Sequence, residues 1–585
     1  MYTDIRSVQI LLSLMKEFGI KDVVLSPGGS DIPIIHSIET DAYFTCYSVV
    51  DERSAAYYAM GVAQQKNRPC ACVCTSGTAV SNYVPGITEA HYQGIPVLAI
   101  TADKNPYYQD QLETQKINQR IVFEEIVKKA VELPIIKDAE DEWLCNRLVN
   151  EALLALTHHG TGPVQINVPI LGNPIEYGCA QLPKERKITV PKINEKLWKG
   201  SAQRLVGKKV MVVVGQDLLF SDDDIKNMNK FYESFDCVFA VEHLSNLSCD
   251  GTVYYYPYTE THPSGAMAQL KPDLIISVGN NLAAYNLKPL LRRNYKEEEN
   301  WLVWESGEVR DAYKCLTTIF ECSPSEFFAK IVEAAVGQKS CHSYFELWES
   351  EVNKIELPEF TFSNFYVAQQ LSKVIPENSI LDTAILNSTR IMQFFKLAKG
   401  VRCYSNVGAL GIDGCFSTFA GHAASTDQLA FLVTGDLSFF YDMNAAGLRS
   451  IRPNVRIILL NNGGGSEFQF FMGKKNIPTI DSYICAEHEK VAAGWVKSLG
   501  YDYYVASTKE ELDAVIAKFG QPSDKPMFLE VLTDMEEDAD KTNAFYDVYR
   551  GGQNVKSSMK SAIKGFLSDK QIRKVKRIMK ILKEK

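Results

Sequence analysis

The chain has 585 residues, of which 46% are hydrophobic and 23% charged, and a formal net charge of −9. This length predicts three or four domains, and the ordinary apolar content predicts globular domains with sizeable cores. The acidic balance argues against nucleic acid as the main partner. No run approaches the roughly 18 apolar residues of a membrane span, and charges interrupt the amphipathic residues 1–22, so neither a span nor a signal peptide is expected. A cytoplasmic location is therefore predicted.

Three of the fourteen cysteines, Cys70, Cys72 and Cys74, fall on one predicted strand. Alternate strand residues share a face, so a metal or redox site is one interpretation. The chain has no Cys-x-x-Cys pair, and a buried strand in a reducing compartment is the favoured interpretation.

Residues 1–180 alternate predicted helices and strands. A helix over 5–18 precedes a strand over 22–25, and a short strand ending at residue 50 precedes a helix of small residues over 55–65. Strands are expected again over 71–74 and 97–100. This βα alternation predicts an α/β domain with a doubly wound, mainly parallel sheet.

Two further α/β units follow. Residues 181–205 are rich in Lys and Pro without a sustained period, which predicts a linker. A central Rossmann-like unit is expected over 206–345, but its start lacks the Gly-x-Gly-x-x-Gly loop of a dinucleotide site. The third unit spans 360–537. Its size and βα pattern resemble those of residues 1–180, which suggests an ancient duplication.

Residues 538–585 form a C-terminal extension of different character. Between 556 and 585 there are eleven Lys and Arg, and Ile572, Val575, Met579 and Leu582 form a stripe with helical spacing. A basic amphipathic helix predicts peripheral contact with an anionic membrane surface or with a partner protein. The alternative is a solvated tail helix that packs its stripe on the body.

The strongest chemical signal lies between residues 434 and 467. Gly435-Asp436-Leu437-Ser438 follows an apolar strand over 429–433, and Asn461-Asn462-Gly463-Gly464 follows another over 457–460. In a βαβ unit both loops lie at the carboxyl ends of parallel strands, where open α/β sheets bind ligands. Carboxylate, amide and carbonyl oxygens suit Mg²⁺ that carries phosphate oxygens.

The spacing from Gly-Asp to Asn-Asn resembles the fingerprint of thiamine-diphosphate (ThDP) enzymes. The stretches VDERSAAYYAMGVA, TSGTAVSNYVPGITEAHYQGIPVLAITAD and YSNVGALGIDGCFSTFAG occur in the order expected for that superfamily. Together they are most similar to the 2-succinyl-5-enolpyruvyl-6-hydroxy-3-cyclohexene-1-carboxylate synthases, the carboligases of the menaquinone pathway. The resemblance covers residues 5–535 and is strongest in the two outer domains. It implies pyrimidine-binding, central and diphosphate-binding domains.

The resemblance implies how the diphosphate end is held. Asp436 and Asn462 would give side-chain oxygens and Gly464 a carbonyl oxygen to Mg²⁺, while Gly435, Leu437 and Ser438 contact the diphosphate. In the alternative interpretation Asp436 caps the next helix and residues 461–463 form a plain turn.

Three further residues match positions around the reactive part of the cofactor. Glu52 matches the family's catalytic glutamate, whose carboxylate beside N1′ of the pyrimidine makes the 4′-amino group basic and requires an apolar, water-poor pocket. The alternative is an acidic residue favoured at a helix start, with Asp51 and Arg53 bracing it. Ile412 matches the apolar wedge between the cofactor rings, or is an ordinary core residue. Gln115 aligns with an active-site glutamine, or is a solvated helix residue.

The chain departs from the family at the substrate-binding positions. Arginines of the family are replaced by Ser30, by Lys104 and by Val407. Near Asn387 the alignment slips, so that Met392 falls where an arginine is expected, and the alternative is that Arg390, two residues earlier, replaces that arginine. In the central domain, where the alignment is poor, Tyr285 and Asn286 stand in place of a Lys-Arg pair. Because each lost guanidinium–carboxylate pair costs about 2–5 kcal/mol, substrates other than 2-oxoglutarate and isochorismate are predicted.

The predicted function is a ThDP- and Mg²⁺-dependent carboligase or decarboxylase that transfers an acyl anion from a 2-oxo acid to an acceptor. The menaquinone-pathway synthase itself, a simple 2-oxo acid decarboxylase and a non-catalytic binding protein remain as alternatives. The resemblance also implies a homodimer or homotetramer, with Glu52 and the Mg²⁺ loop on opposite subunits.

Overall fold

The computed structural model describes residues 1–550 except 173–175, 217, 264, 293–298, 473–476 and 478. These residues form three six-stranded sheets flanked by helices, and the registered strand pairs are parallel. The predicted α/β fold with three mainly parallel sheets is therefore confirmed. The chain divides into two compact units, Met1–Ile193 with Tyr295–Cys322 and Asn194–Asn294 with Ser323–Lys585.

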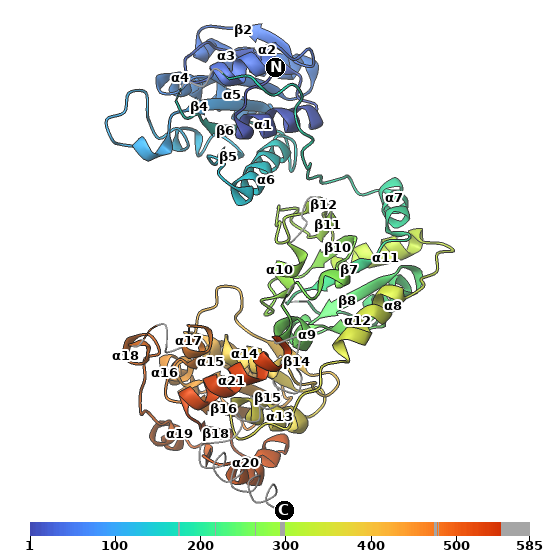
Figure 1. Ribbon diagram of the computed structural model, residues 1–585, viewed down its shortest axis with the longest axis vertical. Helices are drawn as coiled ribbons and strands as arrows, with labels where there is room; N and C mark the ends of the chain where they lie inside the picture. Colours follow the sequence, from blue (N-terminus) through green and yellow to red (C-terminus); the bar gives the residue numbers. More distant parts are fainter. Residues whose placement is uncertain are drawn as a thin grey trace, which may run out of the picture. The chain divides into compact units, whose positions relative to one another are not determined.

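The first sheet, in the blue to teal part of the chain in Figure 1, has the strand order β2-β1-β3-β4-β6-β5. Its strands are β1 (Asp22–Leu25), β2 (Thr45–Ser48), β3 (Cys70–Cys74), β4 (Val97–Asp103), β5 (Lys129–Glu132) and β6 (Val164–Pro169). The helices are α1 (Arg6–Glu17), α2 (Ile32–Glu39), α3 (Glu52–Lys66), α4 (Thr78–Asn82), α5 (Val84–Gln93) and α6 (Ala139–Ala155), with short 3₁₀ turns η1 (Pro106–Tyr108) and η2 (Ile121–Phe123).

Helices cover both faces of this sheet. Side chains of α1, α2 and α6 pack on one face, and those of α3 and α5 pack on the other. A Cβ on Gly86 of α5 would lie only 2.6 Å from Ala56 Cβ of α3, so small residues are needed where these helices cross. Cys70, Cys72 and Cys74 are buried free thiols, and burial raises the pKa of Cys72 to about 12. The buried-strand interpretation is confirmed.

The second sheet has the order β12-β11-β10-β7-β8-β9. Its strands are β7 (Val210–Val214), β8 (Cys237–Val241), β9 (Thr252–Tyr254), β10 (Leu274–Val278), β11 (Glu299–Val303) and β12 (Leu316–Phe320). The accompanying helices are α7 (Glu195–Leu205), α8 (Asp222–Ser234), α9 (Tyr256–Thr261), α10 (Leu287–Leu291), α11 (Pro324–Ala334) and α12 (Ser343–Val352), with η3 (His243–Ser245) and η4 (Ala268–Leu270).

The third sheet has the order β14-β13-β15-β16-β18-β17. Its strands are β13 (Ile380–Thr383), β14 (Arg402–Tyr404), β15 (Ala430–Gly435), β16 (Val455–Asn461), β17 (Asp502–Ala506) and β18 (Met527–Leu532). The helices are α13 (Asn364–Val374), α14 (Asn387–Met392), α15 (Cys415–Ala424), α16 (Asp436–Tyr441), α17 (Ser466–Met472), α18 (Ile480–Tyr483), α19 (Ala493–Ser498), α20 (Lys509–Ile516) and α21 (Met535–Arg550), with η5 (Met443–Gly447) and η6 (Ala517–Gly520).

The first and third sheets share one topology. Numbered from its own first strand, each has the order 2-1-3-4-6-5, whereas the central sheet has the order 3-2-1-4-5-6 reversed end for end. The shared order supports the duplication suggested by the sequence. The central order is that of doubly wound nucleotide-binding folds, whose ligand crevice lies where the strand order reverses, here between β7 and β10.

Two segment boundaries differ from the prediction. The last part of the expected linker is helix α7, in which Asn194 accepts a hydrogen bond from the Leu197 N–H and Trp198, Ala202 and Leu205 are buried. The expected C-terminal extension begins inside α21, where Phe545 packs against Phe365 and Phe394. The basic stripe at 556–585 lies outside the described residues. In the part of the chain that the structure describes, no helix has the length and apolar character needed to cross a membrane.

Candidate active site

Asp436 organises the loops at the carboxyl ends of two neighbouring strands. β15 and β16 pair in parallel, from Ala430 with Val455 to Gly435 with Leu460, so the residues after each strand meet at one sheet edge. The buried Asp436 carboxylate accepts, through Oδ2, the N–H groups of Asn462, Gly463 and Gly464 at 3.1, 2.8 and 3.0 Å. Asp436 therefore fixes the loop after β16, a larger role than capping its own helix.

Two further oxygen atoms converge on this carboxylate. The side-chain oxygen of Asn462 lies 2.7 Å from the Gly464 carbonyl oxygen and 3.3 Å from Asp436 Oδ2, while its amide nitrogen donates to Ser466 Oγ. Rotating the amide by 180° would instead let the nitrogen donate to both oxygens. Octahedral Mg²⁺ with bonds of 2.0–2.1 Å separates adjacent ligand oxygens by roughly 2.9 Å. Both orientations have the same distances, but the first leaves three oxygens facing one another at close to this spacing, an arrangement that a bound cation would compensate. In that orientation these residues fit a Mg²⁺ ion.

The neighbouring residues link this loop to the segment around Ile412. Ser438 Oγ donates to the Ile412 carbonyl at 2.8 Å, and Ile412 packs, half-buried, against Ala384 and Cys415. A Cβ on Gly435 would meet no atom within 4 Å, so open space adjoins this residue.

His488 was not singled out from the sequence. The His488 ring nitrogen Nε2 lies 3.7 Å from Asp436 Oδ2, and the backbone N–H of His488 donates to the Gly463 carbonyl. Burial raises the pKa of Asp436, and His488 opposes that rise. No local pattern marks this histidine, because only the fold of the loop after α18 brings it to Asp436.

Glu52 stands at the corresponding edge of the first sheet. It is the first residue of α3, directly after Asp51, whose carboxylate accepts the N–H groups of Arg53 and Ser54 as the helix cap. Glu52 itself is half-buried, and its carboxylate forms no hydrogen bond within the described ranges. In the single chain it is therefore not enclosed by the apolar, water-poor pocket that the sequence led us to expect.

Asp31 is a second carboxylate near Glu52, and sequence reasoning missed it. Asp31 is 0% exposed, and neither carboxylate oxygen has a hydrogen-bond partner of good geometry among the described residues. Although Asp31 precedes α2, its side chain does not cap that helix. Burial raises the pKa of Asp31 to about 7, and the Glu52 carboxylate contributes to the rise.

Ser30 and Lys104 lie on loops that follow β1 and β4. The Ser30 N–H donates to Thr75 Oγ1 at 3.2 Å, and its hydroxyl lies 3.4 Å from Ser76 Oγ. Lys104 Nζ donates to Glu113 at 2.9 Å and to Thr114 at 3.2 Å. Both expected substrate residues are thus engaged within their own domain.

Gln115 lies in an exposed turn, so the alternative of a helix residue is wrong. Its φ is +58°, a left-handed conformation that is uncommon for a residue with a side chain. A Cβ on Gly77 would lie 3.3 Å from Gln115 Cα, so the turn rests closely on Gly77.

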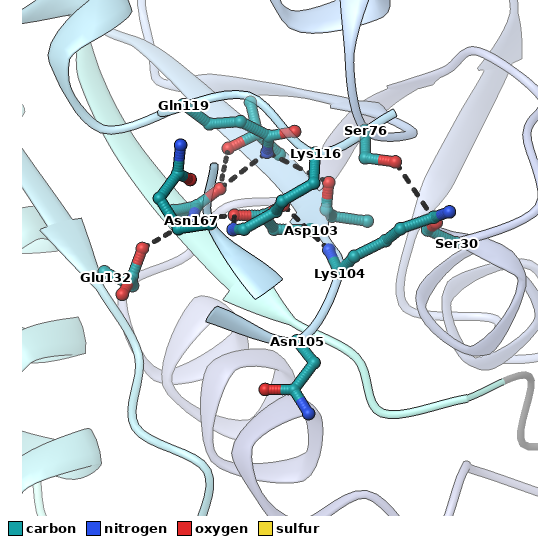
Figure 2. A network of polar contacts seen from close by, with 12 residues as sticks. Ser30, Ser76, Asp103, Lys104, Asn105, Lys116, Gln119, Glu132 and Asn167 are labelled. Carbon is teal, nitrogen blue, oxygen red and sulfur yellow. Dashed lines mark hydrogen bonds and ion pairs between the residues drawn. The ribbon is translucent and has the colours of Figure 1, made fainter. Parts of the chain in front are cut away.

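A buried polar network anchors the residues that follow Gln115 (Figure 2). Lys116 Nζ pairs with Asp103 Oδ2 at 2.5 Å, with the two side chains only 3% and 0% exposed. Gln119 accepts the Gly77 N–H through Oε1 and donates to the Ala102 carbonyl and to Asn167 Oδ1 through Nε2. Asn167 Nδ2 in turn donates to Asp103 and Glu132. The network joins the ends of β4, β5 and β6 to the turn that carries Gln115.

A cavity of about 320 Å³ lies in the second compact unit, between the loop after β10 and residues 386–410. Its lining includes Tyr285, Arg390 and Val407 from the predicted substrate positions, and two cations that sequence reasoning missed, Lys288 and Arg292. Burial lowers the pKa of the Lys288 ammonium, and Arg292 lowers it further. These cations follow Tyr285 and Asn286, the two positions at which a Lys-Arg pair was expected.

Arg390 is held by groups of the protein itself. Its guanidinium pairs with both carboxylate oxygens of Glu467, at 2.5 and 3.0 Å, and donates to Asn387 Oδ1 at 2.8 Å. The Tyr285 ring lies against it, with the centroid 5.2 Å from Arg390 Cζ. Because Glu467 neutralises this arginine, Arg390 differs from an arginine clamp open to a substrate carboxylate.

Three parallel sheets, with one polar edge that carries Glu52 in the first sheet and another that carries Asp436 in the third, are the architecture of thiamine-diphosphate-dependent enzymes. In agreement, residues 5–122 match the family model described as "Thiamine pyrophosphate enzyme, N-terminal TPP binding domain". The chain is thus an enzyme of the ThDP-dependent class, as the sequence predicted.

Curated relatives define the family within that class. The chain is 38% identical over 560 residues to the 2-succinyl-5-enolpyruvyl-6-hydroxy-3-cyclohexene-1-carboxylate synthase of Bacteroides thetaiotaomicron, covering 93% of this chain and 99% of the relative. It is 37% identical to the enzyme of the same name from Phocaeicola vulgatus, covering 95% and 100%, and 29% identical to that from Flavobacterium johnsoniae, covering 91% and 97%. The chain belongs to this family of ThDP-dependent, C–C bond-forming transferases.

The Lys116–Asp103 pair provides a stability test. Lys116→Met should lower the free energy of unfolding by about 3–5 kcal/mol, because Asp103 stays buried without its counter-charge. Lys104→Met, which removes the more exposed pair with Glu113 on the same loop, should cost no more than about 1 kcal/mol. Urea denaturation measures both. Equal costs for the two variants would contradict the buried-pair interpretation, and adding Asp103→Asn to Lys116→Met should recover part of the loss.

Asp31 predicts a pH dependence of stability. The unfolded chain releases this proton near pH 4, whereas the folded chain retains it up to about pH 7, so the stability contributed by the neutral carboxyl is lost as the pH rises between these values. Asp31→Asn should therefore raise the free energy of unfolding at pH 8 and change it little at pH 4. Denaturation curves across this range check the prediction, and a difference that is constant with pH would refute it.

Proposed function

We propose that this enzyme binds ThDP with Mg²⁺ and transfers an acyl anion from a 2-oxo acid to an acceptor. The observation that carries the proposal is the convergence of Asp436, Asn462 and Gly464 oxygens beside open space at Gly435. In this proposal the three oxygens hold Mg²⁺, while Leu437 and Ser438 contact the diphosphate. When bound, ThDP would supply a nucleophilic carbon for addition to the 2-oxo acid and would delocalise the negative charge that loss of CO₂ leaves.

The other residues of the chain have roles around that carbon. Glu52 shares a proton with N1′ of the pyrimidine, a role supported by a carboxylate that has no hydrogen-bond partner within the described ranges. Ile412 supports the cofactor rings from the loop fixed by Ser438. Gln115, on the turn that is anchored by Lys116 and Gln119 directly after it, orients a substrate carboxylate.

We propose substrates that differ from 2-oxoglutarate and isochorismate. Support comes from Ser30 and Lys104, which are engaged within their own domain, and from apolar Val407 and the neutralised Arg390 in the cavity. In this proposal Ser30, Lys104, Asn387, Arg390 and Val407 still contact substrate, but they present less positive charge than the family's arginines.

The relatives' own reaction, from 2-oxoglutarate and isochorismate, is the second candidate. The near-complete coverage of the relatives favours it, and so do Lys288 and Arg292, two cations that line the same cavity. Two cations beside Arg390 can bind a dicarboxylate through a different set of side chains.

The proposed assembly is a cytoplasmic homodimer or homotetramer in which Glu52 and Asp436 of one site come from opposite subunits. Its support is that Glu52 stays half-buried in the single chain, although the proposed chemistry needs a water-poor pocket. Light scattering on the purified protein would measure the mass, and a monomer at working concentration would reject this assembly.

Cofactor binding tests the two halves of the site separately. ThDP with Mg²⁺ should raise the thermal midpoint of the wild type, because a ligand that binds only the folded state stabilises it. Asp436→Ala should abolish the shift. Glu52→Gln should retain the shift and lose turnover by at least about 100-fold. A Glu52→Gln enzyme with normal turnover would reject the catalytic assignment.

A product assay distinguishes the substrates. With ThDP, Mg²⁺, 2-oxoglutarate and isochorismate, we expect no adduct by mass spectrometry, whereas another 2-oxo acid such as pyruvate should lose CO₂. Formation of the succinyl adduct at a normal rate would favour the second candidate. Aldehyde release without any acceptor would instead identify a simple decarboxylase.

A further inference from the structure

The loop after β10 binds two carboxylates of the protein itself. Glu242, at the end of β8, accepts the N–H groups of Ala283 and Ala284 at 2.6 and 3.1 Å. Glu260, on α9, accepts the next two N–H groups, of Tyr285 and Asn286, at 3.0 and 2.9 Å. Four successive backbone N–H groups thus point at two side chains that are only 3% and 5% exposed. Successive N–H groups of this kind form an anion-binding turn.

This turn lies at the crevice where the order of the central strands reverses. There the loops after β7 and β10 touch, since the Gln216 N–H donates to the Asn281 carbonyl and the Asn280 N–H donates to the Gln216 carbonyl. A Cβ on Gly215 would lie 2.0 Å from the Asn280 carbonyl oxygen, so only glycine permits this approach. Glu242 reaches the turn from β8, one strand beyond β7. The position at which related folds bind an anionic ligand is filled by the protein's own carboxylates.

The opposite side of the same turn faces the cavity. Ala283, Ala284 and Tyr285 line it, as does Lys288 on the next helix turn. The turn is also tied to the far wall, because Asn281 Nδ2 donates to the carbonyls of Val407 and Gly408 at 3.3 Å. The position of Tyr285 and Lys288 in the cavity therefore depends on the hydrogen bonds made behind them.

We propose that Glu242 and Glu260 are positioning residues for the substrate: by binding the four N–H groups of residues 283–286, they fix the cavity wall that carries Tyr285 and Lys288. This inference rests on the proposed function only in taking that cavity as the substrate site. Neither glutamate lines the cavity, so both act through the wall.

A pH effect follows from the burial of Glu242. Burial raises the pKa of Glu242 to about 7, while the Ala283 N–H opposes the rise. When the pH falls through this value the carboxylate gains a proton, and one N–H of the wall loses its acceptor. The charged and titratable groups that face Glu242 are Glu260, Tyr254, Tyr255, Tyr256 and Lys288. The KM of the wild type should rise between pH 8 and pH 6.

The test compares Glu242→Gln and Glu260→Gln with Glu333→Gln, an exposed glutamate of the same compact unit. Hydrogen exchange of residues 279–292 measures the wall directly, and steady-state kinetics with 2-oxoglutarate and with pyruvate measure its effect. Both wall variants should exchange faster at 283–286 and raise KM about tenfold with kcat changed less than about threefold, as expected for lost hydrogen bonds to a charged group. The ThDP-induced thermal shift should stay unchanged.

Specific outcomes separate this inference from the proposed function. If Glu242→Gln keeps the wild-type KM and exchange, the inference is overturned, although ThDP-dependent turnover stands. If the wild type turns over neither 2-oxo acid, the exchange measurement still decides whether the glutamates hold the wall. If Glu242→Gln does not fold, Glu260→Gln and the pH dependence of KM carry the test. Glu333→Gln should match the wild type in every measurement.

Discussion

The buried carboxylate of Asp436 is the constraint on which the rest of the site depends. A charge removed from water needs compensation, and three successive N–H groups of the loop after β16 provide it. Holding that loop brings the oxygens of Asn462 and Gly464 to the carboxylate. Ser466 then accepts from both Asn462 and Asn387, and Asn387 accepts from Arg390. A continuous set of hydrogen bonds thus connects the proposed metal site to the proposed substrate cavity.

Buried carboxylates also accept hydrogen bonds from loops at the other two sheets. Buried acids bind the loops that follow strands: Asp103 accepts the Lys104 N–H and pairs with Lys116 in the first domain, and Glu242 and Glu260 bind the turn after β10 in the second. Irregular loops cannot satisfy their own backbone N–H groups, so an internal acceptor fixes them in one conformation. Asp31 differs, because neither of its carboxylate oxygens has a hydrogen-bond partner of good geometry in the described part of the chain, and only the backbone N–H groups of Gly28 and Asp31 oppose the rise of its pKa.

Much of the fold followed from local pattern. Apolar runs at β15 and β16 and the small-residue helix α3 were predicted within a few residues, because strand burial and helix packing impose their periods on short stretches. The elements that lie in polar stretches of the sequence were predicted less accurately. The helix α7 lies in a Lys-rich stretch that gave no period, and the turn of Gln115 has left-handed residues that sequence patterns do not reveal.

By itself the sequence determined the class of enzyme, the three α/β sheets and the stretches at their carboxyl edges, since these depend on residues close together in the chain. Only the tertiary structure decided which charged side chains pair with one another and which line the cavity. Arg390 is neutralised by Glu467, 77 residues away, whereas Lys288 and Arg292 line the cavity that adjoins it. Such pairings depend on which strands become neighbours in the sheet. Pairing of β15 with β16, for example, brings together loops that are far apart in the sequence. Charge compensation in a buried site is therefore a property of the fold.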